Sequence, residues 1–486
     1  MAVVFVFMLG AWLGLEVYFA YTSEPAPDVD HGRRLMDLAA RWQGGEDADD
    51  AWFAVVDLAE RWNSLPAGYA NEADWAATHG NAWIFRFLVE DANDPAKAAE
   101  RTIPKGMTPE EARVSIEINR EAARRALGAW EETGLDGPLD TLVGARRVIR
   151  PLADTTQHPI FQQTLADLPN VRSIAFALRL LMIRSRDEGD WEAYAHRFEQ
   201  LLAIGRVYRW QVSLIEQSMG SAVRMHAIEQ ARRDLASGKL PAEHAPRLVA
   251  AMDRQARAPG LGFAVESSRS ESLTTSQWLH TSRGRIIISD VDSFTGNGGP
   301  GPKASNLLSV FYARRSETDA WINAYYDELR RWYEASPHER RGIIWTIKFP
   351  ESYDDDDASP VAKVRSWAIP ALGRIRASYE QADLEELGLR TQIAIESFRA
   401  RSGGLPETLG DLIPSDLAEL PVDPLADGLV ALGYIRLASL DEYGREYILY
   451  SVGGDGEDNQ GKPGYEGATL YGNNLDGTDF ILNPAR

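Results

Sequence analysis

The chain has 486 residues, of which 44% are hydrophobic and 25% are charged, a composition that excludes wholesale disorder and suggests roughly two to four domains. Lysine and arginine number 51 against 72 acidic residues, so the net charge is −21. Because such a chain repels phosphate backbones, we expect no nucleic-acid partner. There is no cysteine, which excludes disulfides, thiolate metal sites, iron–sulfur clusters and cysteine nucleophiles.

The N-terminus predicts a membrane segment. Residues Ala2–Tyr21 are almost wholly apolar, with Glu16 as the only charge. About 20 residues with a rise of roughly 1.5 Å each match the hydrocarbon thickness of a bilayer, so we expect residues 1–22 to be a transmembrane anchor. A cleaved signal peptide is the alternative, but its apolar region is shorter and follows basic residues that this chain lacks. The positive-inside rule finds no basic residue before the segment and Arg33 and Arg34 after it.

Residues 23–259 are predicted to form a helical, repeat-like body after a short stiff linker at Glu24–Asp28. Two sets of residues recur at helical spacing: Tyr194, Phe198, Leu201, Gly205 and Tyr208, and then Ile215, Met219 and Ala222. Such sets are typical of helix-packing core, with a peptide-binding groove as the alternative. Because no regular repeat length is kept, the fold class we predict is mainly α, either an irregular α-solenoid or a helical bundle.

Residues 260–380 are predicted to form a helical region with flexible loops. Gly296–Lys303 matches the spacing G-x-G-x-x-G, but it does not directly follow the short strand predicted at Arg285–Ser289. Pro300 and Pro302 also lack the backbone N–H groups that a phosphate would need, so we expect no nucleotide. The aspartates at 354–357 indicate a solvated linker, with a metal cluster as the alternative.

No familiar catalytic motif occurs in the sequence. There is no H-E-x-x-H, no G-x-S-x-G and no Walker A pattern, and the eight histidines are well separated along the chain. Catalytic residues need not be neighbours in sequence, however. A membrane-anchored hydrolase with a site in the helical body is therefore the alternative to a non-enzymatic protein.

Residues 381–486 carry an ordered set of segments. They are a helical stripe ending at Gly403–Gly404, the turn Leu405–Pro414, the pair Asp423–Pro424, the strand Tyr447–Val452, the loop Gly453–Gly461 and the closing segment Asp476–Leu482. In this order they resemble the globular head of the major pseudopilin of type II secretion systems. The resemblance implies an α+β head here. Because a long helical body separates this region from the N-terminal segment, we expect a pseudopilin-like head on a tethered body rather than a pilus subunit.

The resemblance also suggests a cellular role. It implies a non-enzymatic protein of the bacterial inner membrane with a single span and its body in the periplasm. Its expected partners are other envelope or secretion-system proteins, in assembly or binding linked to type II secretion.

The C-terminal loop is a candidate metal site. The resemblance implies a structural calcium ion there, with Asp455 and Asp479 as the matching ligands and Asp458 and Asp476 as additional ones. Carboxylates mixed with backbone carbonyls are the ligands that calcium prefers. An EF-hand is disfavoured because Gln460 stands where that loop needs glycine. A solvated hairpin loop without metal remains the alternative.

Overall fold

The computed structural model of the chain describes residues 24–42, 51–64, 133–160, 168–256, 261–287, 314–335, 372–464 and 477–483, together with the separate residues 15, 17–19, 22, 127, 130, 163, 306, 309, 312 and 339. The predicted loops at Ser293–Ala304 and at residues 354–357 lie outside these ranges, as does most of the predicted membrane segment. In the part of the chain that is described, no helix is both long and apolar enough to cross a bilayer.

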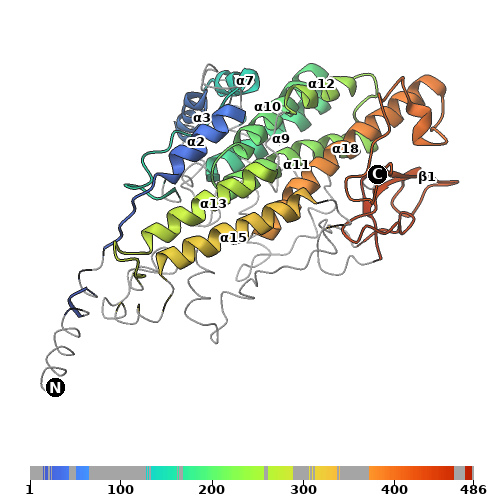
Figure 1. Cartoon of the computed structure of the whole chain (residues 1–486). Helices are drawn as coiled ribbons and strands as arrows, with labels where there is room; N and C mark the ends of the chain where they lie inside the picture. The colour runs from blue at the N-terminus through green and yellow to red at the C-terminus, as the bar shows by residue number, and fades with distance from the viewer. Residues whose placement is uncertain are drawn as a thin grey trace, which may run out of the picture.

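The chain is mainly α, as predicted. The described helices are α2 (His31–Trp42), α3 (Trp52–Ser64), α7 (Asp136–Gly144), α9 (Leu168–Glu188), α10 (Trp191–Arg209), α11 (Leu214–Ala236), α12 (Pro246–Arg254), α13 (Leu261–Trp278), α15 (Arg315–Glu334) and α18 (Leu372–Ser402). Several of the longer helices run alongside one another in a bundle, with the N-terminus at one end and a small sheet at the other (Figure 1). The short helix η3 (Leu409–Leu412) precedes that sheet.

Helix α10 follows the predicted stripe. Asp190 caps its first turn by accepting a hydrogen bond from the backbone N–H of Ala193 at 3.0 Å. Tyr194, Phe198 and Tyr208 are all buried in the main core, where α10 contacts α7, α9, α11 and α12. The interpretation of this stripe as helix-packing core is therefore confirmed.

Helix α11 corrects the second predicted stripe. Ile215 is 55% exposed and Met219 is only partly buried. The buried face instead includes polar and charged side chains, among them Gln217, Arg224 and Asp234. The stripe was wrong because α11 packs against α9, α10, α13 and α18, so its burial does not follow an apolar period.

Two glycines bring α10 and α11 into backbone contact. A Cβ atom at Gly220 would lie 2.5 Å from the backbone nitrogen of Arg209 and 2.6 Å from the carbonyl oxygen of Gly205. Real Cβ atoms do not approach other atoms this closely, so only glycine fits at this crossing. The close approach also packs the Arg224 side chain of α11 against Gly205 of α10, where an added Cβ atom would collide with its Cγ.

Helices α13 and α15 pack together through a separate cluster that includes Val265, Ile322 and Tyr326. Part of the helical structure predicted for residues 260–380 is formed here, since both helices lie in that range. The predicted strand at Arg285–Ser289 is not formed in its described residues, 285–287, which make one isolated bridge between His280 and Ile286.

The C-terminal region combines a helix with a three-stranded antiparallel sheet. The strands are β1 (Gly433–Arg436), β2 (Tyr447–Ser451) and β3 (Phe480–Ile481), in the order β1-β2-β3. Tyr447 and Leu449 of β2 share a core cluster with Leu384 and Ile395 of α18. The predicted boundary of the head, at residue 381, lies inside α18.

Candidate functional site

The acidic loop after β2 lies on the face of the sheet opposite α18. Tyr447 and Leu449 point into the core shared with α18, so Ile448 and Tyr450 point to the other face. A Cβ atom at Gly461 would touch Ile448, Ile435 and the Tyr450 ring, which places this loop residue on that face. The head therefore has three layers, in the order helix, sheet and acidic loop.

Asp479 holds the middle of the loop. It lies just before β3, and its carboxylate accepts hydrogen bonds from the backbone N–H groups of Asn459 at 3.1 Å and Gly461 at 2.6 Å. Its own N–H donates to the Lys462 carbonyl at 2.7 Å. Burial raises the pKa of Asp479, and the charges of Asp458 and Asp455 add to this effect despite the two N–H donors. The three carboxylates thus lie close enough for their charges to interact.

Asp455 and Asp458 fasten other parts of the loop. Asp455 accepts hydrogen bonds from the N–H of Glu457 at 3.0 Å and of Gly477 at 2.9 Å, so it joins the two ends of the segment. Asp458 accepts the Tyr450 hydroxyl at 3.0 Å and the Gln460 N–H at 2.8 Å. Asp455 therefore holds two backbone N–H groups, and Asp458 holds one backbone N–H group and the Tyr450 side chain.

Three of the four predicted ligands are brought near one another, and the fourth, Asp476, lies outside the described residues. Within the described ranges, no group of three or more histidine or acidic side chains is arranged to hold a metal ion. Carboxylate oxygens are nevertheless the ligands that calcium prefers, and the charges of Asp455 and Asp458 act on Asp479. Asp455, Asp458 and Asp479 are the described residues that would hold calcium.

The sequence analysis gave no role to Asp423, which joins three segments of the head. This aspartate is 2% exposed and accepts hydrogen bonds from the Leu425 N–H at 2.9 Å, the Ser451 hydroxyl at 2.8 Å and the Val452 N–H at 2.9 Å. Burial raises its pKa, although these donors favour the charged form. The only signal for it in the sequence was its place in the Asp423–Pro424 pair.

A row of arginines fastens the head to the body. We call this the arginine seam: Arg209, Arg224 and Arg232 on α10 and α11, and Asp383, Glu385 and Glu386 on α18. The pairs Arg209–Asp383 and Arg232–Glu385 each have N–O distances of 2.9 Å, and Arg224 pairs with Glu386. All three arginines are buried. The seam continues into the head, where Arg232 and Gln392 both donate to the carbonyl oxygen of Leu482.

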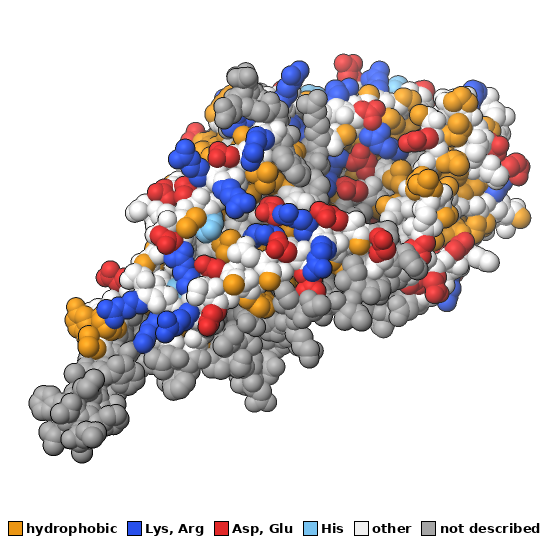
Figure 2. All heavy atoms as spheres, viewed as in Figure 1, with side chains coloured by type: hydrophobic (Ala, Val, Ile, Leu, Met, Phe, Trp, Pro, Cys, Tyr) orange, Lys and Arg blue, Asp and Glu red, His pale blue; other side chains and the backbone are white. Residues whose placement is uncertain are grey.

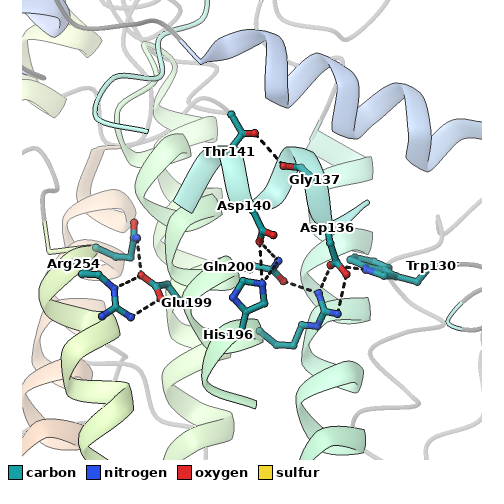
Figure 3. A network of polar contacts seen from close by, with 11 residues as sticks. Trp130, Asp136, Gly137, Asp140, Thr141, His196, Glu199, Gln200 and Arg254 are labelled. Carbon is teal, nitrogen blue, oxygen red and sulfur yellow. Dashed lines mark hydrogen bonds and ion pairs between the residues drawn. The ribbon is translucent and has the colours of Figure 1, made fainter. Parts of the chain in front are cut away.

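A second polar network lies on the helical body and bears on the hydrolase alternative (Figure 3). His196 of α10 lies 2.9 Å from Asp140 of α7, and both side chains are about half exposed. Burial raises the pKa of Asp136, but hydrogen bonds from Arg197 and Trp130 outweigh it and leave that pKa below its usual range. Asp136 thus serves as a partner for Arg197 and for the Trp130 N–H.

One other carboxyl group in the body titrates at an unusual pH. Burial, together with the charge of Glu216, raises the pKa of Glu271 on α13 to about 7, although a backbone hydrogen bond from Leu214 acts in the opposite direction. Glu216 is itself buried and paired with Arg150 at 2.8 Å. The described apolar pocket between α3, α7, α9 and α10, which Val55 and Ile174 help to line, contains neither carboxylate nor imidazole. Glu271 therefore does not line this pocket.

Comparison with family models, with curated proteins and with solved structures finds no match to this chain.

Proposed function

We propose that this chain is a non-enzymatic, membrane-anchored protein of the bacterial envelope with a pseudopilin-like, calcium-binding head. Its role is in assembly or binding linked to type II secretion, with envelope or secretion-system proteins as partners. Residues 1–22 anchor it in the inner membrane by a single span, and the body faces the periplasm.

The observation that carries this proposal is the acidic loop on the sheet. Asp455 and Asp479 lie at the two ends of one segment, and each accepts backbone N–H hydrogen bonds from residues distant in the loop. A second support is the order of elements in this region, in which helix α18 is followed by the antiparallel sheet that lies between it and the acidic loop. The resemblance is based on segments in this same order. Calcium would supply positive charge to the carboxylates and would fix the ends of the segment.

The body supports the proposal as a scaffold. Its buried arginines are engaged with α18 through the arginine seam, so the head is held in one position relative to the bundle. For the hydrolase alternative, the described polar network around His196 is made of hydrogen bonds and ion pairs among its own side chains, and the described apolar pocket contains no carboxylate or imidazole.

Calcium-dependent unfolding of the full chain tests the head. Wild-type protein should melt at a higher temperature in calcium than in a chelator. At a calcium concentration of 100 times the Kd, the free energy of unfolding should rise by about 2.7 kcal/mol. Asp455→Asn and Asp479→Asn should each remove the calcium-dependent part. Asp37→Asn, which changes an exposed aspartate on α2, is the matched control and should keep it. Equal melting of the wild type in calcium and chelator would refute the calcium site.

The link to secretion needs a separate experiment. In the source bacterium, loss of this chain should reduce the proteins released by type II secretion, and wild-type but not Asp479→Asn protein should restore them. An unchanged set of secreted proteins without the chain would refute the secretion role, even if calcium still stabilises the head.

A further inference from the structure

The segment that follows the predicted membrane span is fastened to the bundle. The Ala26 N–H donates to the His280 carbonyl at 3.1 Å. The Val29 N–H donates to the side-chain oxygen Oε1 of Gln277 on α13 at 3.2 Å, and Nε2 of the same side chain donates to the Val29 carbonyl at 2.9 Å. Arg315 of α15 pairs with Asp28 at 2.5 Å. The linker is therefore part of the fold, and it fixes which end of the bundle lies nearest to the N-terminal segment.

That end carries exposed arginines. Arg33 and Arg34 lie in the first turn of α2, Arg283 lies in the turn after α13, and Arg314 immediately precedes α15. We call these four residues the arginine collar. Figure 2 shows Lys and Arg side chains next to hydrophobic side chains on the described surface at this end of the molecule. The collar thus lies at the end of the bundle from which residues 24–30 lead to the N-terminal segment.

Two observations place the collar beside that segment. The guanidinium carbon of Arg283 lies 3.5 Å from the centre of the Phe19 ring, a cation–π contact with the last part of the apolar run. Burial lowers the pKa of His31 in α2, and the charges of Asp319 and Arg315 on α15 act on the same ring. Helices α2 and α15 therefore meet at the same end of the bundle.

The neighbouring carboxylates mostly serve the fold. Asp30 accepts a hydrogen bond from the Thr155 hydroxyl at 2.7 Å, and Asp319 accepts one from Ser276 at 2.6 Å. Glu317 accepts the N–H of Arg314 at 3.0 Å and so caps α15. Glu24, Asp28 and Glu317 are exposed at this end, and Asp28 pairs with Arg315. In a chain with a net charge of −21, four exposed arginines at one end of the bundle are a local concentration of positive charge.

We propose that the arginine collar binds the phosphate groups of anionic phospholipids in the membrane that holds residues 1–22. The inference rests on the proposed anchor. The collar is complementary in charge to such lipids and continuous with the apolar segment, and Tyr18 and Phe19 lie where aromatic side chains meet a membrane interface. The linker at Ala26–Val29 is hydrogen-bonded to the bundle. The bundle is therefore held with the C-terminal end of α13 and the N-terminal end of α15 against the lipid headgroups.

The lack of cysteine makes a direct test available. Ser282→Cys, next to Arg283 and exposed, gives a single site for a nitroxide label in the full chain. The labelled protein is placed in vesicles of phosphatidylcholine alone or of phosphatidylcholine with phosphatidylglycerol, each with a trace of lipid that carries gadolinium on its headgroup. We expect the gadolinium to relax the label in both membranes and severalfold more strongly with phosphatidylglycerol.

Variants separate the collar from the anchor. Replacing all four collar arginines with glutamine should abolish the increase that phosphatidylglycerol causes, while the protein still resists carbonate extraction. Arg172→Gln with Arg247→Gln, which alters exposed arginines elsewhere on the bundle, should keep the increase. A label at Ser439→Cys in the head should show no such increase in any variant.

The outcomes distinguish the two proposals. If the protein resists carbonate extraction but phosphatidylglycerol does not change relaxation of the 282 label, the collar is refuted and the anchor stands. If the collar variant keeps the full increase, the collar is also refuted. If wild-type protein is extracted by carbonate, the anchor itself fails and the inference fails with it.

Discussion

Asp423 shows how one buried carboxylate can join three segments of a small domain. It accepts two backbone N–H groups and one hydroxyl, and its side chain has almost no contact with solvent. Asp423→Ala would leave these donors buried without an acceptor, and each such donor costs about 1–3 kcal/mol. With three such donors, we therefore predict a loss of at least about 3 kcal/mol in the free energy of unfolding, measured by urea denaturation. The exposed Asp37→Asn should change it by less than about 0.5 kcal/mol.

Glu271 predicts a pH dependence of stability. Its pKa is raised from 4.5 to about 7 in the folded chain, by burial and by the charge of Glu216. Between these two values the folded state binds more protons than the unfolded state, so stability should fall as pH rises from about 4.5 to about 7. Glu271→Gln should flatten this slope, with a gain of about 1–3 kcal/mol over wild type near neutral pH. A slope that is the same in both proteins would contradict the prediction.

At the scale of single elements, glycine decides two contacts that larger residues cannot make. Gly433 of β1 pairs with Tyr450 of β2, and the Tyr450 ring covers the position where a Cβ would stand. Gly433→Ala should move the ring and break its hydrogen bond to Asp458, with a cost of about 1–3 kcal/mol. Gly404→Ala, where nothing lies within 4 Å of the added carbon, is the control. Equal thermal unfolding of both variants would contradict this account of β1.

The crossing of α10 and α11 is the second such contact. Gly220→Ala would drive a methyl group into the backbone of α10, so the two helices would have to separate. We predict a loss of more than about 3 kcal/mol, because backbone cannot move aside as the end of a side chain can. Gly144→Ala in α7 meets open space and should be neutral or slightly stabilising. Denaturant titration of the two variants makes the comparison.

These helices also show what a sequence can and cannot predict. The core face of α10 was predicted because Tyr194 and Phe198 recur at helical spacing. The core face of α11 was not, because its buried Arg224 and Arg232 find their partners on α18, more than 150 positions away. The period of apolar residues depends only on neighbours along the chain, so it cannot predict ion pairs between α11 and α18. The acidic loop was located through the order of its motifs, whereas the role of Asp423 depends on distant segments that meet only in the fold.

At the scale of the whole molecule, the arginine seam joins the head and the body. Leu389 and Ile393 of α18 belong to the core of the body, whereas Leu384 and Ile395 of the same helix belong to the core of the head. Because one helix contributes to both cores, we predict that the head and the bundle unfold together. Scanning calorimetry of the full chain should show one transition for both.

Breaking the seam should weaken both parts. Arg232→Met leaves Glu385, which is 12% exposed, without its partner at 2.9 Å, and we predict a loss of about 3–5 kcal/mol. The exposed pair Arg184–Glu188 offers a control, since Arg184→Met should cost less than about 1 kcal/mol. A calorimetric trace in which Arg232→Met lowers the head transition alone would show that the seam does not couple the two parts.

The position of α18 also has a mechanical consequence. The helix has 31 residues and is therefore about 46 Å long, with the sheet packed on one part of it and α11 alongside another. A pull on the head along this axis would load the ion pairs of the seam side by side, in shear, so that they share the force rather than open one after another. The same pull would travel through the bundle to the fastened linker at Ala26–Val29. A protein built in this way resists tension between its C-terminal head and its N-terminal end.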